Sequence, residues 1–456
     1  MQINDTIAAV STPPGTGAIS IVRLSGQKSL QIIKKIFQPI KKTDITRPGF
    51  YNGIIKFKNK VIDQVVILVR RCPHSYTGED LIEINCHGGM LITRDVLKTV
   101  LENKARLACP GEFTKRAFLN KKIDLTQAEA INDLIMAKTE KSKQYALEQL
   151  FGKFSGYVDS LRKKLIQIMA KLEVSLDHPE EDIDTVTGRE LKAEITQILS
   201  QLEQLLKTAH KGLALHYGIN AVIAGKANVG KSSLFNFFLK KDRALVSDIP
   251  GTTRDIIEDW LDIEGIPVKL VDTAGFKKAF DIIDHMSVQK THQAIETSHM
   301  ILAVFDATKR IEKEDENLIN KLSQVKSKAI YILNKTDRPL RINRNRLKNL
   351  LKTNIIEVSA LEGKGLEKIE KKISQIVMGS DQPGSDIMIT NLRYESSMRE
   401  AKSHLEEVLK GLKEQRPMEI LASDIRRAIL HLEEIIGKFT TEDLLDSIFS
   451  GFCIGK

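Results

Sequence analysis

The sequence predicts a multidomain α/β protein in which a doubly wound, mainly parallel sheet is inserted into a helical domain. Three stretches of different character along the 456 residues support this prediction. Strand signals dominate residues 1–120, helical patterns dominate residues 121–215 and 381–456, and apolar strands alternate with helices over residues 216–380. At about 150 residues per domain, the length also suggests roughly three domains.

The first segment is expected to form an α+β domain. Residues 18–24 and 61–69 are rich in β-branched side chains, and residues 81–84 form a third apolar run before His87-Gly88-Gly89. Such runs, bounded by glycine, proline or asparagine, are typical of strands. A helical pattern around residues 93–101 supplies the α component.

The two helical segments each carry an apolar stripe with helical spacing. The stripes consist of Leu191, Ile195, Ile198, Leu202 and Leu205, and of Leu421, Ile425, Ile429, Leu432 and Ile436. Thr440 and Asp443 are expected to cap a last helix that reaches Phe449. Helices on both sides of the α/β segment indicate an insertion, and two separate helical domains would also fit.

The segment between them shows the pattern of a parallel sheet with helices on both faces. Its five apolar strand-like runs are residues 219–224, 268–271, 300–305, 329–333 and 355–358.

The overall charge is basic, with 69 Lys and Arg against 59 Asp and Glu, a net charge of +10. This balance permits a polyanionic partner such as nucleic acid, although a bland solvated surface can be equally basic. The four cysteines, which form no C-x-x-C pair, argue against a zinc ribbon or a disulfide scaffold. The N-terminus lacks a signal pattern and no apolar run reaches about 20 residues, so we expect a cytoplasmic protein without a membrane span.

A phosphate-binding sequence follows the first strand of the α/β segment. Residues 225–232 read Gly-Lys-Ala-Asn-Val-Gly-Lys-Ser and match the pattern G-x-x-x-x-G-K-[ST] between a strand and a helix. The glycines let backbone N–H groups surround phosphates, Lys231 neutralises the charge of the β- and γ-phosphates, and the Ser232 hydroxyl reaches Mg²⁺. We therefore predict a nucleoside triphosphate site with Mg²⁺.

Three further motifs, each at the end of a strand, indicate GTP rather than ATP. Asp272 opens the sequence Asp-Thr-Ala-Gly, whose glycine can present its N–H to the γ-phosphate. Asn334 opens Asn-Lys-Thr-Asp, in which the carboxylate of Asp337 can accept both N1–H and N2–H of guanine. Ser359-Ala360 follow the last strand, where a backbone N–H can bind guanine O6. The carboxyl ends of strands are where open α/β sheets bind ligands.

The loop over residues 247–255, Ser-Asp-Ile-Pro-Gly-Thr-Thr-Arg-Asp, is expected to be a switch that completes the Mg²⁺ site through Thr253. The residues predicted to bind GTP are Asn228, Val229, Gly230, Lys231, Ser232, Ser233, Ser247, Asp248, Ile249, Pro250, Gly251, Thr252, Thr253, Asp272, Thr273, Ala274, Gly275, Asn334, Lys335, Thr336, Asp337, Ser359 and Ala360.

Phe276 follows the Asp-Thr-Ala-Gly motif, where a Ras-like GTPase has a glutamine that orients the attacking water. Another group must therefore position the water here. Asn228 and the 247–255 loop are similar to the corresponding sequences of GTPases that bind K⁺ beside the phosphates. This similarity implies K⁺ ligands at Asn228, Ser247, Ile249 and Thr252. Asn228 can also be interpreted as a simple turn residue.

The two ends of the chain carry sequences that other potassium-dependent GTPases lack. They are Asp5-Thr6-Ile7-Ala8-Ala9, Thr12-Pro13-Pro14-Gly15, Ser75-Tyr76-Thr77-Gly78-Glu79-Asp80, His87-Gly88-Gly89, residues 110–120, residues 124–130 and Phe452-Cys453-Ile454-Gly455-Lys456. With the nucleotide motifs, these sequences resemble the MnmE (TrmE) family of tRNA modification GTPases over nearly the whole chain.

The resemblance implies a dimerising, tetrahydrofolate-binding-like domain at residues 1–120, a helical domain in two parts at 121–215 and 381–456, and a G domain at 216–380. The implied ligands are GTP, Mg²⁺, K⁺ and 5-formyltetrahydrofolate or a related one-carbon folate. We expect a homodimer that joins an FAD-dependent partner of the MnmG (GidA) type in a heterotetramer. The implied reaction adds an aminomethyl-type (carboxymethylaminomethyl) group at C5 of the wobble uridine of certain tRNAs, driven by GTP hydrolysis.

The resemblance also assigns a folate site. Arg23, Glu83, Lys122 and Lys456 match folate-site positions. Arginine and lysine can bind the folate glutamate and a carboxylate can bind pterin N–H groups, although composition alone would make Arg23 and Lys122 ordinary surface charges. Cys453 is interpreted as a nucleophilic or redox thiol, with a small apolar packing residue as the alternative.

One position departs from the family pattern. The family has a glutamate after Asp-Thr-Ala-Gly that is thought to orient the hydrolytic water, and the matching residue here is Asp284. Aspartate keeps the carboxylate but is one methylene shorter, and a 1 Å misplacement can lower a rate by up to ~10²-fold. Ser287 and Lys277 also differ from the family residues nearby. We expect Asp284 to act as the water-orienting group, with slower turnover than is usual.

Two other functions fit part of the sequence. An RNA-binding ribosome-assembly GTPase without carbon chemistry would explain the nucleotide motifs but not residues 453–456. A folate enzyme whose G domain serves only as a dimerisation switch is the third possibility. The basic stretch from Arg338 to Lys352 contains no acidic residue and either contacts tRNA phosphates or, the preferred interpretation, forms a solvated helix face.

Overall fold

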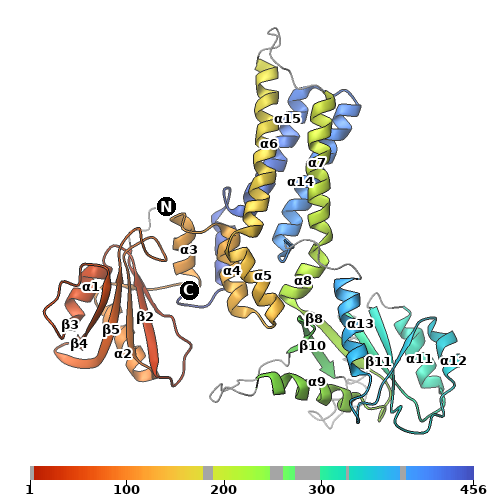
Figure 1. The fold of residues 1–456 in the computed structure, drawn as a ribbon. Coiled ribbons are helices and arrows are strands. Elements are labelled where there is room, and N and C mark those ends of the chain that lie inside the picture. Colours follow the sequence, from red (N-terminus) through yellow and green to blue (C-terminus); the bar gives the residue numbers. More distant parts are fainter. Residues whose placement is uncertain (1–4, 178–187, 247–259, 273–297, 325–327, 380–386) are drawn as a thin grey trace. The chain divides into compact units, whose positions relative to one another are not determined.

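The computed structural model describes residues 5–177, 188–246, 260–272, 298–324, 328–379 and 387–456 (Figure 1). The chain divides into two compact units, which comprise residues 1–132, 148–185 and 417–456, and residues 133–147 and 186–416. Each unit is therefore assembled from segments that lie far apart in the sequence. Among the described helices, none combines the length and the apolar character that a membrane-spanning segment requires.

The first unit contains a seven-stranded sheet with two helices on one face. Its strands are β1 (Ile7–Val10), β2 (Ile19–Ser25), β3 (Phe37–Pro39), β4 (Gly49–Phe57), β5 (Lys60–Arg70), β6 (Leu81–His87) and β7 (Arg106–Leu107), in the order β3-β4-β5-β6-β2-β1-β7. All neighbours are antiparallel except β1 and β7. α1 (Ser29–Ile36) and α2 (Met90–Glu102) cover the core, in which Ile33, Ile84 and Val96 are fully buried. The predicted α+β class of this segment is confirmed.

Helices account for most of the remaining first unit and for part of the second. They are α3 (Glu112–Leu119), α4 (Leu125–Met136), α5 (Glu140–Leu150), α6 (Lys153–Asp177), α7 (Gly188–Lys207), α8 (Ala209–Tyr217), α14 (Leu392–Lys413), α15 (Met418–Ile436) and α16 (Glu442–Ser450). The apolar stripes predicted on α7 and α15 are buried.

Two helix pairs join chain segments from before and after the second sheet. In the first unit α6 packs against α15, and Arg162 on α6 donates to Glu433 on α15 at 2.7 Å. In the second unit α7 packs against α14. Both pairings agree with an inserted α/β domain and argue against two separate helical domains.

The last helix begins one residue later than predicted. Its N-cap is Thr441, whose hydroxyl oxygen accepts a hydrogen bond from the N–H of Leu444 at 3.3 Å, and not Thr440. Thr441 still has extended backbone angles, φ −96° and ψ 157°, which is the conformation that an N-cap residue adopts. The prediction was wrong because two adjacent threonines offer the same hydroxyl and only the backbone decides between them.

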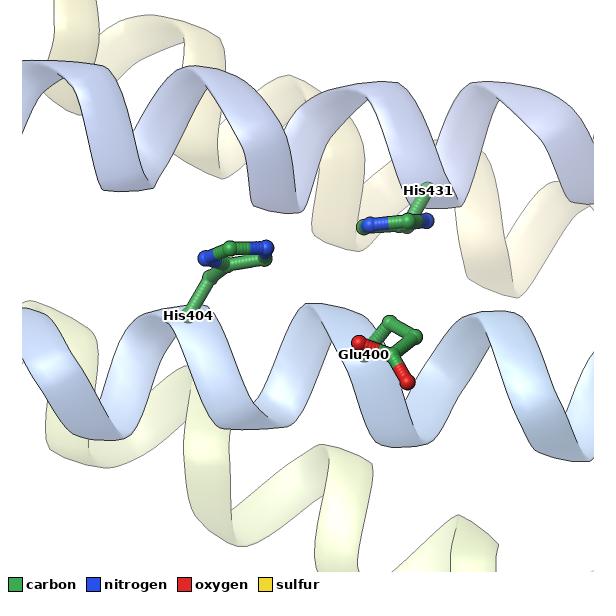
Figure 2. Close-up of side chains that lie close together, drawn as sticks. All are labelled: Glu400, His404 and His431. Carbon is green, nitrogen blue, oxygen red and sulfur yellow. The ribbon is translucent and has the colours of Figure 1, made fainter.

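Polar side chains also mark α14 and α15. Figure 2 shows Glu400 and His404 on the same face of α14, as their four-residue spacing requires. His431 lies on α15, where its Nδ1 is 3.2 Å from a carboxylate oxygen of Glu434.

The second sheet has six strands and helices on both faces. Its strands are β8 (Ile219–Ala224), β9 (Trp260–Ile263), β10 (Ile266–Asp272), β11 (Met300–Asp306), β12 (Lys328–Asn334) and β13 (Ile355–Glu357), in the order β13-β12-β11-β8-β10-β9. Its helices are α9 (Lys231–Val246), α11 (Lys313–Leu322), α12 (Arg344–Leu351) and α13 (Leu366–Met378). α13 packs on the face that buries Leu302, and α11 and α12 pack on the opposite face with Ile301 and Phe305. The predicted doubly wound class is confirmed.

One strand of this sheet was not predicted. β9 is one of the two edge strands and pairs antiparallel with β10, whereas every other pairing in the sheet is parallel. The turn between β9 and β10 contains Glu264 and Gly265, both with positive φ. Because a glutamate rarely adopts this conformation, the hairpin gave little signal in the sequence.

A buried arginine links three parts of the first unit. Arg116 on α3 is 1% exposed, and its guanidinium bonds Glu112 at 2.9 Å, Glu79 at 3.2 Å and Asp5 at 2.5 Å. Arg106 adds two hydrogen bonds to Glu112, at 2.6 and 3.0 Å. Burial would raise the pKa of Glu112, but the hydrogen bonds from its partners outweigh burial and lower it. The network fixes the chain before β1, the loop before β6 and α3 together.

We expect Arg116→Met to destabilise the first unit by about 3 kcal/mol, because Glu79 loses its cation and the buried Glu112 keeps only one of its two arginine partners. Amide hydrogen exchange of β1 and β6, followed by mass spectrometry, measures the loss. Arg94→Met is the matched control, because Arg94 pairs with Asp95 at the surface and should change stability by less than about 1 kcal/mol. Equal protection of β1 and β6 in the two variants would contradict the proposed importance of the network.

Candidate functional site

The predicted phosphate loop, residues 225–232, connects β8 to α9. Asn228 has φ 63° and Gly230 has φ 101°. A Cβ atom at Gly230 would lie 2.1 Å from Nδ2 of Asn334, so this position accepts only glycine. The ammonium of buried Lys231 donates to the carbonyl oxygens of Gly225 at 2.9 Å and Lys226 at 2.6 Å. The loop thus gathers a helix N-terminus and a cation, the two features that bind phosphate.

Asn334 holds this loop against the end of the sheet. Its side chain is 2% exposed, and Nδ2 donates to the carbonyl oxygen of Val229 at 2.9 Å. Its Oδ1 accepts the N–H of Ala360 at 3.0 Å. One buried amide therefore connects the phosphate loop after β8, the motif after β12 and the loop after β13.

Lys335 forms a second link to the phosphate loop. Its ammonium donates to the carbonyl oxygen of Asn228 at 2.5 Å and to Asp306 at 2.6 Å. Burial would raise the pKa of Asp306, but hydrogen bonds from Lys335 and Thr308 outweigh burial and lower it. Asp306 was not singled out in the sequence, although an acid at the end of an apolar strand is a usable signal.

Asp337 is the acceptor expected to read guanine. Its Oδ1 accepts a hydrogen bond from the hydroxyl of Ser359 at 2.6 Å, which lowers the pKa of Asp337. Ser359 is buried and the side chain of Asp337 is only 10% exposed, with its other oxygen 3.7 Å from Nε of Arg338, so the hydroxyl and the guanidinium together orient the carboxylate. The N–H of Thr336 donates to the carbonyl oxygen of Val358 at 3.2 Å and aligns the two loops.

Several predicted site residues lie outside the described part of the chain. They are Ser247, Asp248, Ile249, Pro250, Gly251, Thr252, Thr253, Thr273, Ala274, Gly275 and Asp284. The backbone of Asp272 ends β10, and its side chain is also outside the described part. The first residues of α9, Ser232 and Ser233, are exposed beside the phosphate loop.

A second group of predicted residues meets in the first unit. Arg23 on β2 pairs with Glu83 on the neighbouring strand β6, with N···O distances of 2.9 and 2.8 Å. Arg23 also donates to the carbonyl oxygen of Gly455 at 3.2 Å, and the Ser11 hydroxyl donates to the same oxygen at 3.0 Å. These contacts bring the C-terminal motif to the Arg23–Glu83 pair.

Lys456 lies in the same group. Its carbonyl oxygen accepts the N–H of Phe113 at 3.1 Å. Burial and the nearby charge of Arg23 lower the pKa of the Lys456 ammonium, although Glu83 and Cys453 act in the opposite direction. The ammonium therefore occupies a place where an added anion would be stabilised.

Two further predicted residues of the first unit, Cys453 and Lys122, make other contacts. The Cys453 residue is exposed, and its carbonyl oxygen accepts the N–H of Gly111 at 3.3 Å. The ammonium of Lys122 donates to the carbonyl oxygen of Pro73 at 3.1 Å. The structure thus joins Arg23, Glu83 and Lys456, whereas the hydrogen bond of Lys122 goes to the loop after β5.

We expect Asn334→Ala to destabilise the second unit, because it leaves the carbonyl of Val229 and the N–H of Ala360 buried without their partner. The cost is about 1–3 kcal/mol for each group. Trp260, the only tryptophan, lies on β9, so urea unfolding followed by its fluorescence measures the loss. Asn345→Ala, at an exposed position of α12, is the control and should change stability by less than about 0.5 kcal/mol. A similar stability of both variants would show that Asn334 does not hold the loops.

Comparison with protein families gives two matches that together cover most of the chain. The family model described as the GTP-binding protein TrmE N-terminus matches residues 6–122. The model described as the MnmE helical domain matches residues 125–453.

Full-length relatives give the same result. The chain is 43% identical to the tRNA modification GTPase MnmE of Thermotoga maritima, over 99% of this chain and 100% of that protein. It is 42% identical to MnmE of Ligilactobacillus salivarius, over 99% and 98% of the two chains. A solved structure of Aquifex aeolicus Era bound to GDP and aluminium fluoride is 26% identical over 41% of this chain and 66% of that chain, with a TM-score of 0.27. From the family models and the full-length relatives we conclude that the chain belongs to the MnmE family of tRNA modification GTPases.

Proposed function

We propose that this tRNA modification GTPase works with an FAD-dependent partner of the MnmG type to build a carboxymethylaminomethyl-type group at C5 of the wobble uridine. The observation that carries the proposal is the contact of Gly455 and Lys456 with the Arg23–Glu83 pair. It supports the proposal because it brings the C-terminal motif, which includes Cys453, beside residues that resemble folate-site positions. A one-carbon site and a GTP site in the same chain support carbon chemistry coupled to GTP hydrolysis.

We infer that GTP binds at the carboxyl edge of the second sheet. Lys231 neutralises the β- and γ-phosphates, and Ser232 and Thr253 complete the Mg²⁺ shell. The carboxylate of Asp337 accepts the two guanine N–H groups, and Asn334 holds the phosphate loop and the guanine loops in register.

We infer that K⁺ stimulates hydrolysis, with Asn228, Ser247, Ile249 and Thr252 as its ligands. The bond from Lys335 to the carbonyl oxygen of Asn228 supports this role, because it fixes the loop at that residue. Asp284 orients the attacking water in place of the glutamine of Ras-like GTPases. The active form is a cytoplasmic homodimer that joins its partner protein in a heterotetramer.

We infer that a one-carbon tetrahydrofolate, such as 5-formyltetrahydrofolate, binds at the Arg23–Glu83 pair. The residues fit such a ligand, because Lys456 is half-buried close to another cation and a carboxylate would relieve their repulsion. Arg23 and Lys456 would hold the folate glutamate, Glu83 would accept pterin N–H groups, and Lys122 would extend the site. The bound folate would supply the one-carbon unit.

Mass spectrometry of tRNA nucleosides tests the proposed reaction. Removal of the protein from cells should abolish a C5-modified wobble uridine, and Cys453→Ser should reduce it strongly if the thiol takes part. Cys72→Ser is the matched control, since Cys72 is also exposed but is remote in sequence from the C-terminal motif. An unchanged nucleoside profile without the protein would reject the proposal in favour of an RNA-assembly GTPase.

Folate binding can be tested separately. We expect Lys456→Gln to weaken 5-formyltetrahydrofolate binding about 10- to 100-fold, the effect of losing one charge-assisted hydrogen bond. The neutral amine cannot replace the ammonium and the pKa of Lys456 is lowered. The affinity for folate should therefore fall as the pH rises and the ammonium loses its proton. Because the pKa is lowered, this fall should begin at a lower pH than it would with an ordinary lysine. Calorimetric titration of the full chain measures both effects, with exposed Lys41→Gln as the control. Equal affinities in the two variants would remove Lys456 from the site.

A further inference from the structure

A cavity of about 840 Å³ lies in the first unit, outside the nucleotide motifs and outside the Arg23–Glu83 pair. The end of α3, the start of α4, the first turns of α6 and the end of α15 surround it. Of its three lysines, only Lys122 belongs to a predicted site, and Lys121 and Lys438 have no role in the proposed reaction.

The charges of the cavity favour an anion. Its two carboxylates are already engaged by the protein. Asp124 accepts hydrogen bonds from the Thr126 hydroxyl at 2.7 Å and from the N–H of Gln127 at 2.9 Å. Asp159 accepts from Lys438 at 2.8 Å, and its lysine partners hold the pKa of Asp159 at about 2, although burial opposes them. Because Asp159 is paired with Lys438, the other two lysines, Lys121 and Lys122, face one remaining carboxylate, Asp124, and leave the cavity with an excess of positive charge.

The floor of the cavity contains a glycine that packing does not require. Gly156 lies within α6, and a Cβ atom at this position would meet no heavy atom within 4 Å. Glycine is up to about 1 kcal/mol less favourable than alanine in a helix, and neither crowding nor a positive φ compensates for that cost here. Gly152, one turn earlier, also lines the cavity. Because these two glycines have no side chain, a planar ligand group can approach their backbone closely.

The remaining walls are apolar. Phe118, Leu119, Ile123 and Ile436 contribute side chains beside the lysines. A cavity that combines apolar walls, a bare floor and cations suits a ligand with a planar ring and an anionic group.

We propose that this cavity binds one nucleotide of the tRNA substrate, with the base between the apolar wall and the backbone at Gly156 and the phosphate at Lys121. The inference rests on the tRNA substrate of the proposed function and adds a recognition site to it. A nucleotide has the required combination of a flat base and a phosphate, and stacking of a base tolerates any sequence.

Substitutions at Gly156 test the site with little risk to the fold, because its Cβ enters open space. Gly156→Glu and Gly156→Gln place side chains of nearly equal shape in the cavity, and only the first carries a negative charge. In the full chain, Gly156→Glu should bind unmodified tRNA transcript at least about fivefold more weakly than Gly156→Gln. Basal GTP hydrolysis should be equal in both, since neither touches the nucleotide motifs. Equal tRNA affinities would overturn the proposal.

The salt dependence of tRNA binding provides an independent measurement. Lys121→Gln should reduce the slope of log K against log salt by about one, the change expected for one lost phosphate contact. Exposed Lys41→Gln should leave the slope unchanged. An unchanged slope in Lys121→Gln would also overturn the proposal.

Competition with uridine monophosphate separates the two sources of a nucleotide. Weakened binding of free uridine monophosphate by Gly156→Glu, without any change in tRNA affinity, would make the cavity a small-molecule site and overturn the tRNA assignment. Failure of the proposed reaction would appear instead in the nucleoside profile of cells that lack the protein, so the two failures can be told apart.

Discussion

The carbonyl oxygens of Gly455 and Lys456 accept hydrogen bonds from Ser11, Arg23 and Phe113, and these bonds fasten the C-terminal motif to the first domain. Because Ser11 and Gly455 are 444 positions apart in the sequence and in contact in the structure, the polypeptide must leave the first domain and return to it. The pairing of α6 with α15 and of α7 with α14 follows this course. The α/β domain lies in the sequence between the partners of these helix pairs, so it is an insertion in the helical part of the chain.

The two groups of predicted site residues are held in place by different kinds of contact. At the edge of the second sheet, Asn334 and Lys335 bond to backbone carbonyls of the phosphate loop, so neutral and charged donors position the loop directly. In the first unit, Arg23 is bonded to Glu83 and Gly455, and Arg116 stabilises the surrounding elements through buried ion pairs. Both groups of residues are thus hydrogen-bonded within the protein before a ligand binds, although the buried Nε of Arg116 has no partner among the described residues.

Sequence reasoning succeeded where one local pattern determines the structure. The stripe that includes Leu202 on α7 and the apolar run of β11 are buried as their spacing indicated, and the phosphate loop follows its strand. It failed where the structure depends on distant partners. Nothing near Arg116 in the sequence shows that it meets Asp5 and Glu79, and β9 exists only because it completes a hairpin with β10. The cavity at Gly156 likewise depends on three segments that come together only in the fold.

The contact between Arg23 and Gly455 spans 432 positions of the sequence, which has a consequence for synthesis. Ribosomes add about 5–20 residues per second, so roughly 20–90 seconds separate the emergence of the two partners. During that time the first domain can fold its sheet and its Arg116 network, but the Arg23–Glu83 pair lacks its contact with Gly455. A nascent chain is therefore unable to form this contact while the second sheet is still being made, and the C-terminal motif joins the first domain only after that sheet has been synthesised.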